Sequence, residues 1–159
     1  MKKLLELLKH NARLSNEQLA VMLDTTADDI AAKIAAYEQQ GIIMGYSALI
    51  NEEKLDRENV TAYIEVKVTP KPDRGFDELA ATIKKYDEVD SVFLMSGGYD
   101  LAVTVNGNSL RDVALFVSER LSVLDGVIST ATHFVLQRYK EKGIIFGGES
   151  HDERSLVSP

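Results

Sequence analysis

The chain has 159 residues, 45% of them hydrophobic and 27% charged, which suits one globular domain or two small ones. It has no cysteine, so disulfides and thiolate metal sites are excluded. Its net charge of −7 disfavours binding to the phosphates of nucleic acid. No apolar run is long enough to cross a bilayer, and Glu6 and Lys9 interrupt the position of a signal-peptide core, so we expect a cytoplasmic protein.

The first 41 residues predict three helices. Lys2 to Asn11 carries four leucines at near-helical spacing. A second helix begins at a capping box formed by Ser15 and Gln18, and it ends near Leu23. A third helix begins only a few residues later and ends at Gly41. This close pair predicts a helix-turn-helix, whose second helix would enter the major groove of DNA.

The third helix has an acidic start. Asp29 follows Thr26 at the spacing of a second capping box, which favours a structural role. Asp28 points outward, where its carboxylate could accept a hydrogen bond from a cytosine amino group or could repel phosphate. The first 58 residues carry seven basic and ten acidic side chains, a net charge of −3, which disagrees with a DNA-binding role.

Two connecting segments follow the helices. Residues 42–50 are apolar with a glycine inside, which favours a short strand or wing. Residues 51–59 are charged and polar and are predicted to form a linker. The domain organisation expected is therefore a DNA-binding domain at 1–50, this linker, a second domain at 60–146, and a flexible tail at 147–159.

The second domain shows two kinds of periodicity. Strict alternation of apolar and polar residues predicts strands, and stripes at helical spacing predict helices. In chain order these are a strand at 60–68, a helix at 76–86, strands at 89–95 and 99–105, a helix at 109–121 and a strand at 127–139. This βαββαβ order predicts an α+β ferredoxin-like sandwich with four antiparallel strands and both helices on one face. A second copy of the domain would cover the other face.

Motifs for catalysis are absent from the sequence. The histidines His10, His133 and His151 fall on separate elements, and no P-loop, dinucleotide-binding glycine motif or nucleophile elbow occurs. We therefore expect no enzymatic activity, no cofactor and no metal site.

Three segments resemble the Lrp/AsnC family, also called feast/famine regulators. Gly41 to Asn51 resembles the family's strand after the recognition helix, and Met95 to Leu101 resembles its glycine–aromatic–aspartate hairpin. Gly126 to Leu136 resembles its last strand. The likeness runs from about residue 4 to residue 142. It implies a transcriptional regulator with an N-terminal winged helix-turn-helix, which forms homodimers through the C-terminal sheets and often octamers, and binds a small effector, commonly an amino acid.

The resemblance also implies two sets of site residues. Double-stranded DNA would contact the start of the third helix at Thr26, Ala27, Asp28, Asp29, Ala32 and Lys33. The effector would bind at Gly97, Gly98, Tyr99, Asp100, Thr130 and Thr132. In that site the glycine amides would meet a carboxylate, and Asp100, expected to project from the sheet face that bears Ala102 and Thr104, would pair with an ammonium group. The glycines could instead form only a hairpin turn, and the threonines could reflect only strand preference.

The sequence departs from the family at the recognition helix. Arg or Lys residues usual on its exposed face are reduced to Lys33, Asp28 is acidic, and Asp24 replaces a glycine common in the turn between the helices. Lys2, Lys3, Lys9 and Arg13 are possible phosphate contacts. Two other functions therefore stay open: a small-molecule sensor with weakened DNA binding, and a regulatory amino-acid-binding subunit of an enzyme.

Overall fold

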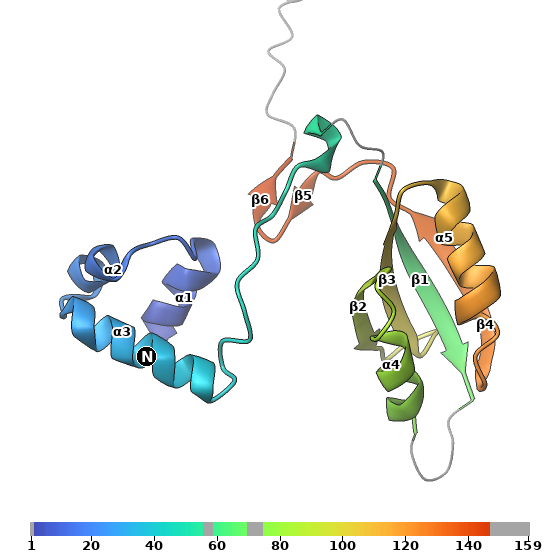
Figure 1. Ribbon diagram of the computed structural model, residues 1–159, viewed down its shortest axis with the longest axis horizontal. Coiled ribbons are helices and arrows are strands. Elements are labelled where there is room, and N and C mark those ends of the chain that lie inside the picture. The colour runs from blue at the N-terminus through green and yellow to red at the C-terminus, as the bar shows by residue number, and fades with distance from the viewer. Residues whose placement is uncertain (1, 56–58, 70–74, 147–159) are drawn as a thin grey trace, which may run out of the picture. The chain divides into compact units, whose positions relative to one another are not determined.

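The computed structural model describes residues 2–55, 59–69 and 75–146 (Figure 1). The chain folds into two compact units, and the division between them falls between Ile50 and Asn51. The expected flexible tail at 147–159 lies outside the described residues. The described part of the expected linker belongs to the second unit, where Glu52–Lys54 forms a short 3-10 helix and Glu52 accepts a hydrogen bond from the Asn59 amide.

The first unit contains the three expected helices, α1 (Lys2–His10), α2 (Asn16–Leu23) and α3 (Ala27–Gln39). One residue or more from each helix enters a common core, whose buried members are Leu4, Leu19, Ala20, Ile30 and Tyr37. Leu19 and Ile30 are fully buried, so α2 and α3 are fixed against each other by apolar packing.

Capping residues set both ends of α2. The capping box at Ser15 is complete, because its hydroxyl accepts from the Gln18 amide at 3.2 Å and its amide donates to the Gln18 side chain at 2.9 Å. Asp24 ends α2 in the left-handed conformation, with φ of 53°. Aspartate tolerates this conformation better than most residues, so the turn forms without the glycine common in the family.

The strand expected at 42–50 is not present, and the segment is irregular. Gly41, with φ of 68°, turns the chain at the end of α3, and the amides of Ile42 and Ile43 both donate to the Tyr37 carbonyl. The Tyr46 hydroxyl then donates to Glu38 at 2.9 Å. A strand needs a neighbouring strand for its backbone groups, and the described residues of the first unit supply none.

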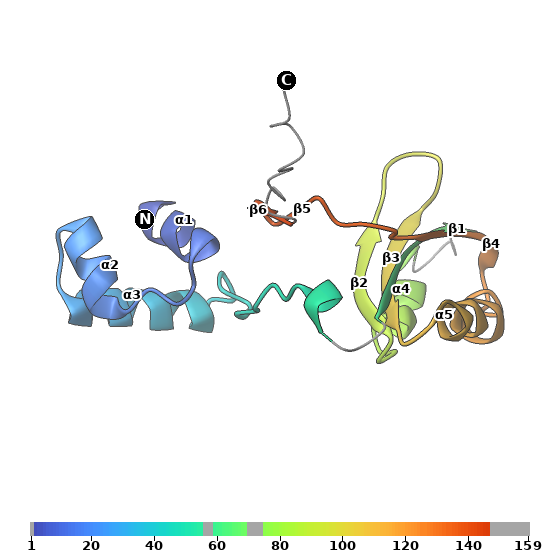
Figure 2. The same ribbon diagram turned by 90° about the horizontal axis from the view of Figure 1, so that it is seen from above.

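The second unit is a four-stranded antiparallel sheet in the order β2-β3-β1-β4. Its elements are β1 (Val60–Val68), α4 (Asp77–Ile83), β2 (Val89–Leu94), β3 (Leu101–Gly107), α5 (Leu110–Phe116) with a π-helical continuation at Val117–Leu121, and β4 (Val127–Phe134). Figures 1 and 2 show α4 and α5 on the same face of the sheet. The ferredoxin-like βαββαβ fold is therefore confirmed.

The last strand is shorter than expected. β4 ends at Phe134, which lies opposite Ala62, rather than at Tyr139. Because β1 begins at Val60, residues after Val135 have no partner strand there, and the chain forms a separate hairpin of β5 (Lys140–Glu141) and β6 (Ile144–Ile145). Of the other elements expected in this unit, β1 has the expected bounds, and the rest are present with ends shifted by one to five residues, as is common for boundaries predicted from sequence.

The two faces of the sheet differ in cover. Alternate residues of β1, including Ala62, Ile64 and Val66, are buried against Ile83 of α4 and Phe116 of α5. The opposite face carries Tyr63 of β1 and Phe93 of β2, which pair with Thr104 and Ala102 of β3. Their side chains are 52% and 58% exposed. The protein thus has one helix-covered face and one open face that bears aromatic side chains.

Candidate DNA-binding and effector sites

The start of α3 uses two of the expected DNA-binding residues in its own cap. The Thr26 hydroxyl accepts from the Asp29 amide at 3.2 Å, and the Asp29 carboxylate accepts from the Thr25 hydroxyl at 3.1 Å. These bonds support the structural interpretation of Asp29. Asp28, Ala32 and Lys33 are exposed, and Ala27 is half-buried. The first turn of α3 therefore presents Asp28 to solvent as a negative charge.

Lysines from two helices gather beside α3. Lys2 and Lys3 of α1 and Lys33 of α3 line one hollow of about 490 Å³, with Leu23 and Thr25 on its wall. The sequence indicated these three lysines separately, and only the packing of α1 against α2 and α3 brings them together. They supply positive charge next to the recognition helix, which partly offsets the acidic start of α3.

Two titratable groups of this unit are perturbed. Hydrogen bonds from the backbone and from Ser15 at the start of α2 lower the pKa of Glu17. Loss of hydration, and then the hydrogen bond and the charge of Glu38, raise the pKa of Tyr46. A hydrogen bond contributes to each pKa shift, although for Tyr46 it comes second to the loss of hydration, and neither side chain is among the expected DNA contacts.

The glycine turn between β2 and β3 is open on its outer side. Gly97 and Gly98 are exposed, neither has a positive φ, and a Cβ at either position would meet no atom within 4 Å. The fold of one subunit therefore does not require glycine at these two positions. Glycine at both positions is therefore consistent with a ligand or a neighbouring subunit that approaches the backbone of the turn.

Asp100 ties this turn to β1. Its carboxylate accepts from the Val68 amide at 2.8 Å, its own amide donates to the Val66 carbonyl at 3.0 Å, and its carbonyl accepts from Met95. The carboxylate was expected to project from the sheet face that bears Ala102 and Thr104. Instead, one of its oxygens is directed to the end of β1, where it satisfies a backbone donor of the strand.

The two threonines lie at the same end of the sheet on the other side of β1. Thr130 is opposite Val66 and Thr132 is opposite Ile64, so both threonines belong to the helix-covered face. The Thr130 hydroxyl is 3.1 Å from the Ser122 hydroxyl. One strand separates them from Asp100, so the two groups are about 10 Å apart across the sheet. Tyr99 is half-buried beside Asp100.

Comparison of the sequence with protein-family models identifies the family of this chain. Residues 61–145 match the family model described as the Lrp/AsnC ligand-binding domain. The chain belongs to the Lrp/AsnC family of transcriptional regulators. It is 48% identical over 157 residues to an uncharacterized HTH-type transcriptional regulator, YugG, of Bacillus subtilis (strain 168), covering 98% of this chain and 95% of that protein. It is 29% identical to the leucine-responsive regulatory protein of Haemophilus influenzae, covering 90% and 86% of the two chains.

Solved structures show the same fold as this regulator. The transcriptional regulator NMB0573 of Neisseria meningitidis, solved as a complex with L-Met, has a TM-score of 0.72 and 27% identity, and the match covers 87% of this chain and 89% of that one. Escherichia coli AsnC has a TM-score of 0.69 and 24% identity, covering 89% and 93%, and supports the fold alone.

Neither a metal-binding cluster nor a membrane-spanning helix occurs in the part of the chain that the structure describes. Those residues contain no group of three or more His, Cys, Asp or Glu side chains placed to hold a metal ion. Within the same ranges, no helix has the length and hydrophobicity needed to span a membrane.

Proposed function

We propose that this regulator binds double-stranded DNA through α3, assembles at least as a homodimer in the cytoplasm, and responds to an amino acid bound by its C-terminal domain. The observation that carries the proposal is the match of residues 61–145 to the Lrp/AsnC ligand-binding domain, which follows a capped helix-turn-helix. Such a protein acts by binding, so no enzymatic activity is proposed. A thermal-shift screen of the amino acids beside a promoter-DNA binding assay tests the proposal.

The proposal of DNA binding depends on Lys33 of α3 and on Lys2 and Lys3 of α1, which line the same hollow. Few cations face the groove, so affinity should be modest and should fall steeply as salt rises. Asp28 is the exposed carboxylate that opposes binding most directly. The acidic start of α3 also favours a second candidate function, a small-molecule sensor with weakened DNA affinity, which the promoter assay distinguishes.

Replacing Asp28 with asparagine should strengthen binding to non-specific duplex DNA. A carboxylate near phosphate costs about 1 kcal/mol in water at 4 Å, so the gain should be roughly fivefold at low salt and smaller at physiological salt. Fluorescence anisotropy at two salt concentrations measures the gain. Glu6→Gln removes the same charge from α1 and should change affinity less. Weaker binding with lost discrimination at one base pair would instead assign Asp28 to base recognition.

The proposal of effector binding depends on the turn at Gly97–Asp100. The glycine backbone there has open space beside it, and the Asp100 carboxylate is held by the Val68 amide. The backbone amides would receive the carboxylate of an amino acid, and Asp100 would stabilise its ammonium group. Thr130 and Thr132 lie across β1 at the same end of the sheet. Completion of the site by a neighbouring subunit is part of the proposal, because one strand separates the two groups within a subunit.

Replacing Asp100 with alanine should lower both stability and effector affinity. The Val68 amide loses its acceptor, which should cost about 1–3 kcal/mol of unfolding free energy. Loss of a charge-assisted contact to the ammonium should weaken binding about tenfold or more. Calorimetry and thermal melting with the amino acid that gives the largest thermal shift measure both effects. A lower melting temperature with unchanged affinity would mean that Asp100 only ties the turn to β1.

Gly98→Ala is the companion variant. A Cβ at Gly98 meets no atom of its own subunit, so the melting temperature of the free protein should stay the same. The added methyl should weaken binding if the effector contacts the backbone of the turn. Together the two variants separate loss of fold from loss of ligand.

The proposal of a homodimer depends on the open face of the sheet. Tyr63 and Phe93 are more than half exposed there, and His133 of β4 lies 3.4 Å from Glu65 of β1 on the same face. A second copy of this face would bury the aromatic rings by two-fold symmetry. Closed dimers of this kind are the unit from which larger assemblies such as octamers would form.

A further inference from the structure

The second unit has a cavity of about 620 Å³ at the end of the sheet where β1 begins and β4 ends. Its walls include Asn51 and Glu52 before β1, Thr61 within β1, and the chain after β4. The Gly97–Asp100 turn lies beside Val66 and Val68, at the far end of β1 and about 20 Å away along the strand. The cavity is therefore separate from the candidate effector site.

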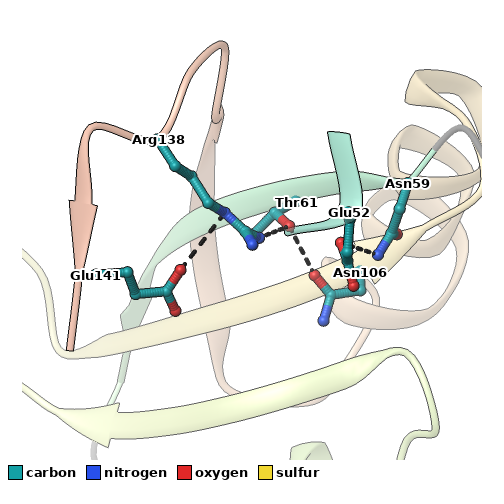
Figure 3. A network of polar contacts seen from close by, with 6 residues as sticks. All are labelled: Glu52, Asn59, Thr61, Asn106, Arg138 and Glu141. Atoms are coloured by element: carbon teal, nitrogen blue, oxygen red, sulfur yellow. Dashed lines mark hydrogen bonds and ion pairs between the residues drawn. The ribbon is translucent and has the colours of Figure 1, made fainter. Parts of the chain in front are cut away.

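The charged groups on its wall favour an anion. Arg111 and Arg138 line the cavity against one acid, Glu52, in a chain whose net charge is −7. Arg138 is held in place, because its guanidinium donates to the Thr61 hydroxyl at 2.7 Å and lies 3.6 Å from the Glu141 carboxylate (Figure 3). Arg111 is exposed and has no hydrogen bond or ion pair within the described ranges. A fixed and an unpaired guanidinium on one wall suit a carboxylate.

A polar network behind Arg138 supports the orientation of its side chain. The Thr61 hydroxyl accepts a hydrogen bond from the Arg138 guanidinium and donates one to the Asn106 side chain at 2.8 Å (Figure 3). Glu52 is also engaged, because it accepts from the Asn59 amide. Pre-set side chains of this kind reduce the entropy that a ligand must overcome on binding.

Asn51 supplies an acceptor that lacks a donor. Its side-chain oxygen is buried and forms no hydrogen bond with any described residue. A buried acceptor without a partner is unfavourable, so a ligand N–H or O–H that reaches it gains this bond. Apolar side chains complete the wall, among them Leu110 and Leu136, which are 57% and 95% exposed.

We propose that this cavity binds a small carboxylate that has an apolar body and one hydrogen-bond donor. The carboxylate pairs with Arg111 and Arg138, the donor bonds to the Asn51 oxygen, and the apolar part covers Leu110 and Leu136. The volume lies within the range of small-molecule sites. This proposal goes beyond the proposed function, because none of these residues belongs to the DNA or effector site.

Three small acids with the same carbon skeleton show whether the ligand needs a hydrogen-bond donor. Calorimetry on the full chain compares 2-hydroxyisovalerate, L-valine and isovalerate, which carry a hydroxyl, an ammonium group and no donor. A hydroxy acid or an amino acid should bind at least tenfold more tightly than isovalerate, and the tighter of the two identifies the donor. Asn51→Leu should reduce that tighter binding to the level of isovalerate. Asn51→Ser, which keeps an acceptor on a shorter side chain, should retain part of the preference if the fold is intact.

The cationic wall is tested with charge-matched variants. Arg111→Gln should weaken the binding of every acid at least tenfold without a change in melting temperature, because the side chain is exposed and unpaired. Lys85→Gln removes the same charge from an exposed position outside the cavity and should bind as the wild type does.

Three results would overturn the proposal. The first is the absence of binding by all three acids at millimolar concentration. The second is binding that Asp100→Ala removes and Arg111→Gln leaves intact, which places the ligand at the effector turn and leaves the proposed function standing. The third is a smaller assembly mass for Arg111→Gln with no acid bound by the wild type, which makes this wall a contact between subunits.

Discussion

Replacing Leu19 with alanine should unfold the N-terminal unit and abolish DNA binding while the C-terminal domain stays folded. Leu19 is fully buried at the centre of the three-helix core, next to Leu4 and Ile30. Removing a buried leucine side chain costs about 2–5 kcal/mol, and a unit of about fifty residues has little stability beyond that. Scanning calorimetry should lose or lower one transition, and anisotropy should show DNA affinity reduced by more than about a hundredfold.

Val21→Ala is the matched control for this experiment. Val21 lies on the same helix and is 84% exposed, so its truncation should leave both the melting profile and DNA affinity unchanged. Effector binding by Leu19→Ala should persist, because the two units have separate cores. DNA binding by Leu19→Ala at wild-type strength would show that the helix-turn-helix is not the DNA-binding element.

Replacing Phe93 with glutamate should dissociate the assembly. Phe93 is 58% exposed on the open face of the sheet, and in a dimer formed through this face its ring would be buried. A carboxylate placed there without a partner should cost about 2–4 kcal/mol, which raises the dimer dissociation constant roughly 30-fold to 1,000-fold. Light scattering at micromolar concentration should then report the mass of one chain.

Leu94→Glu tests whether the face matters. Leu94 is the next residue of β2, is 62% exposed and points to the helix-covered side. The same substitution one residue along should leave the mass unchanged. A wild-type protein that is already a monomer would contradict both the dimer and an effector site completed by a second subunit. Equal effects of both substitutions would place the interface elsewhere.

Local signals in the sequence determined the elements of the fold. The capping box at Ser15 and Gln18 forms as predicted, and the Thr26 cap starts α3 at Ala27. Strict alternation identified β1 with the same bounds that the structure has. These predictions depend on residues two to four positions apart, where side-chain spacing and backbone hydrogen bonding are fixed by helix and strand geometry. The order of the elements then limited the topology to the ferredoxin-like sheet.

Tertiary structure decided where strands end and which side chains meet. β4 stops where β1 supplies no further partner, and residues 42–50 form no strand because no neighbouring strand is present within the first unit's described residues. The Asp100 carboxylate bonds to an amide 32 residues away, and Lys33 joins Lys2 and Lys3 only when α1 packs on α3. The sequence thus determined the family, the elements and the candidate residues. Strand register and helix packing decided their hydrogen-bond partners, because those partners lie far apart along the chain and no local pattern encodes them.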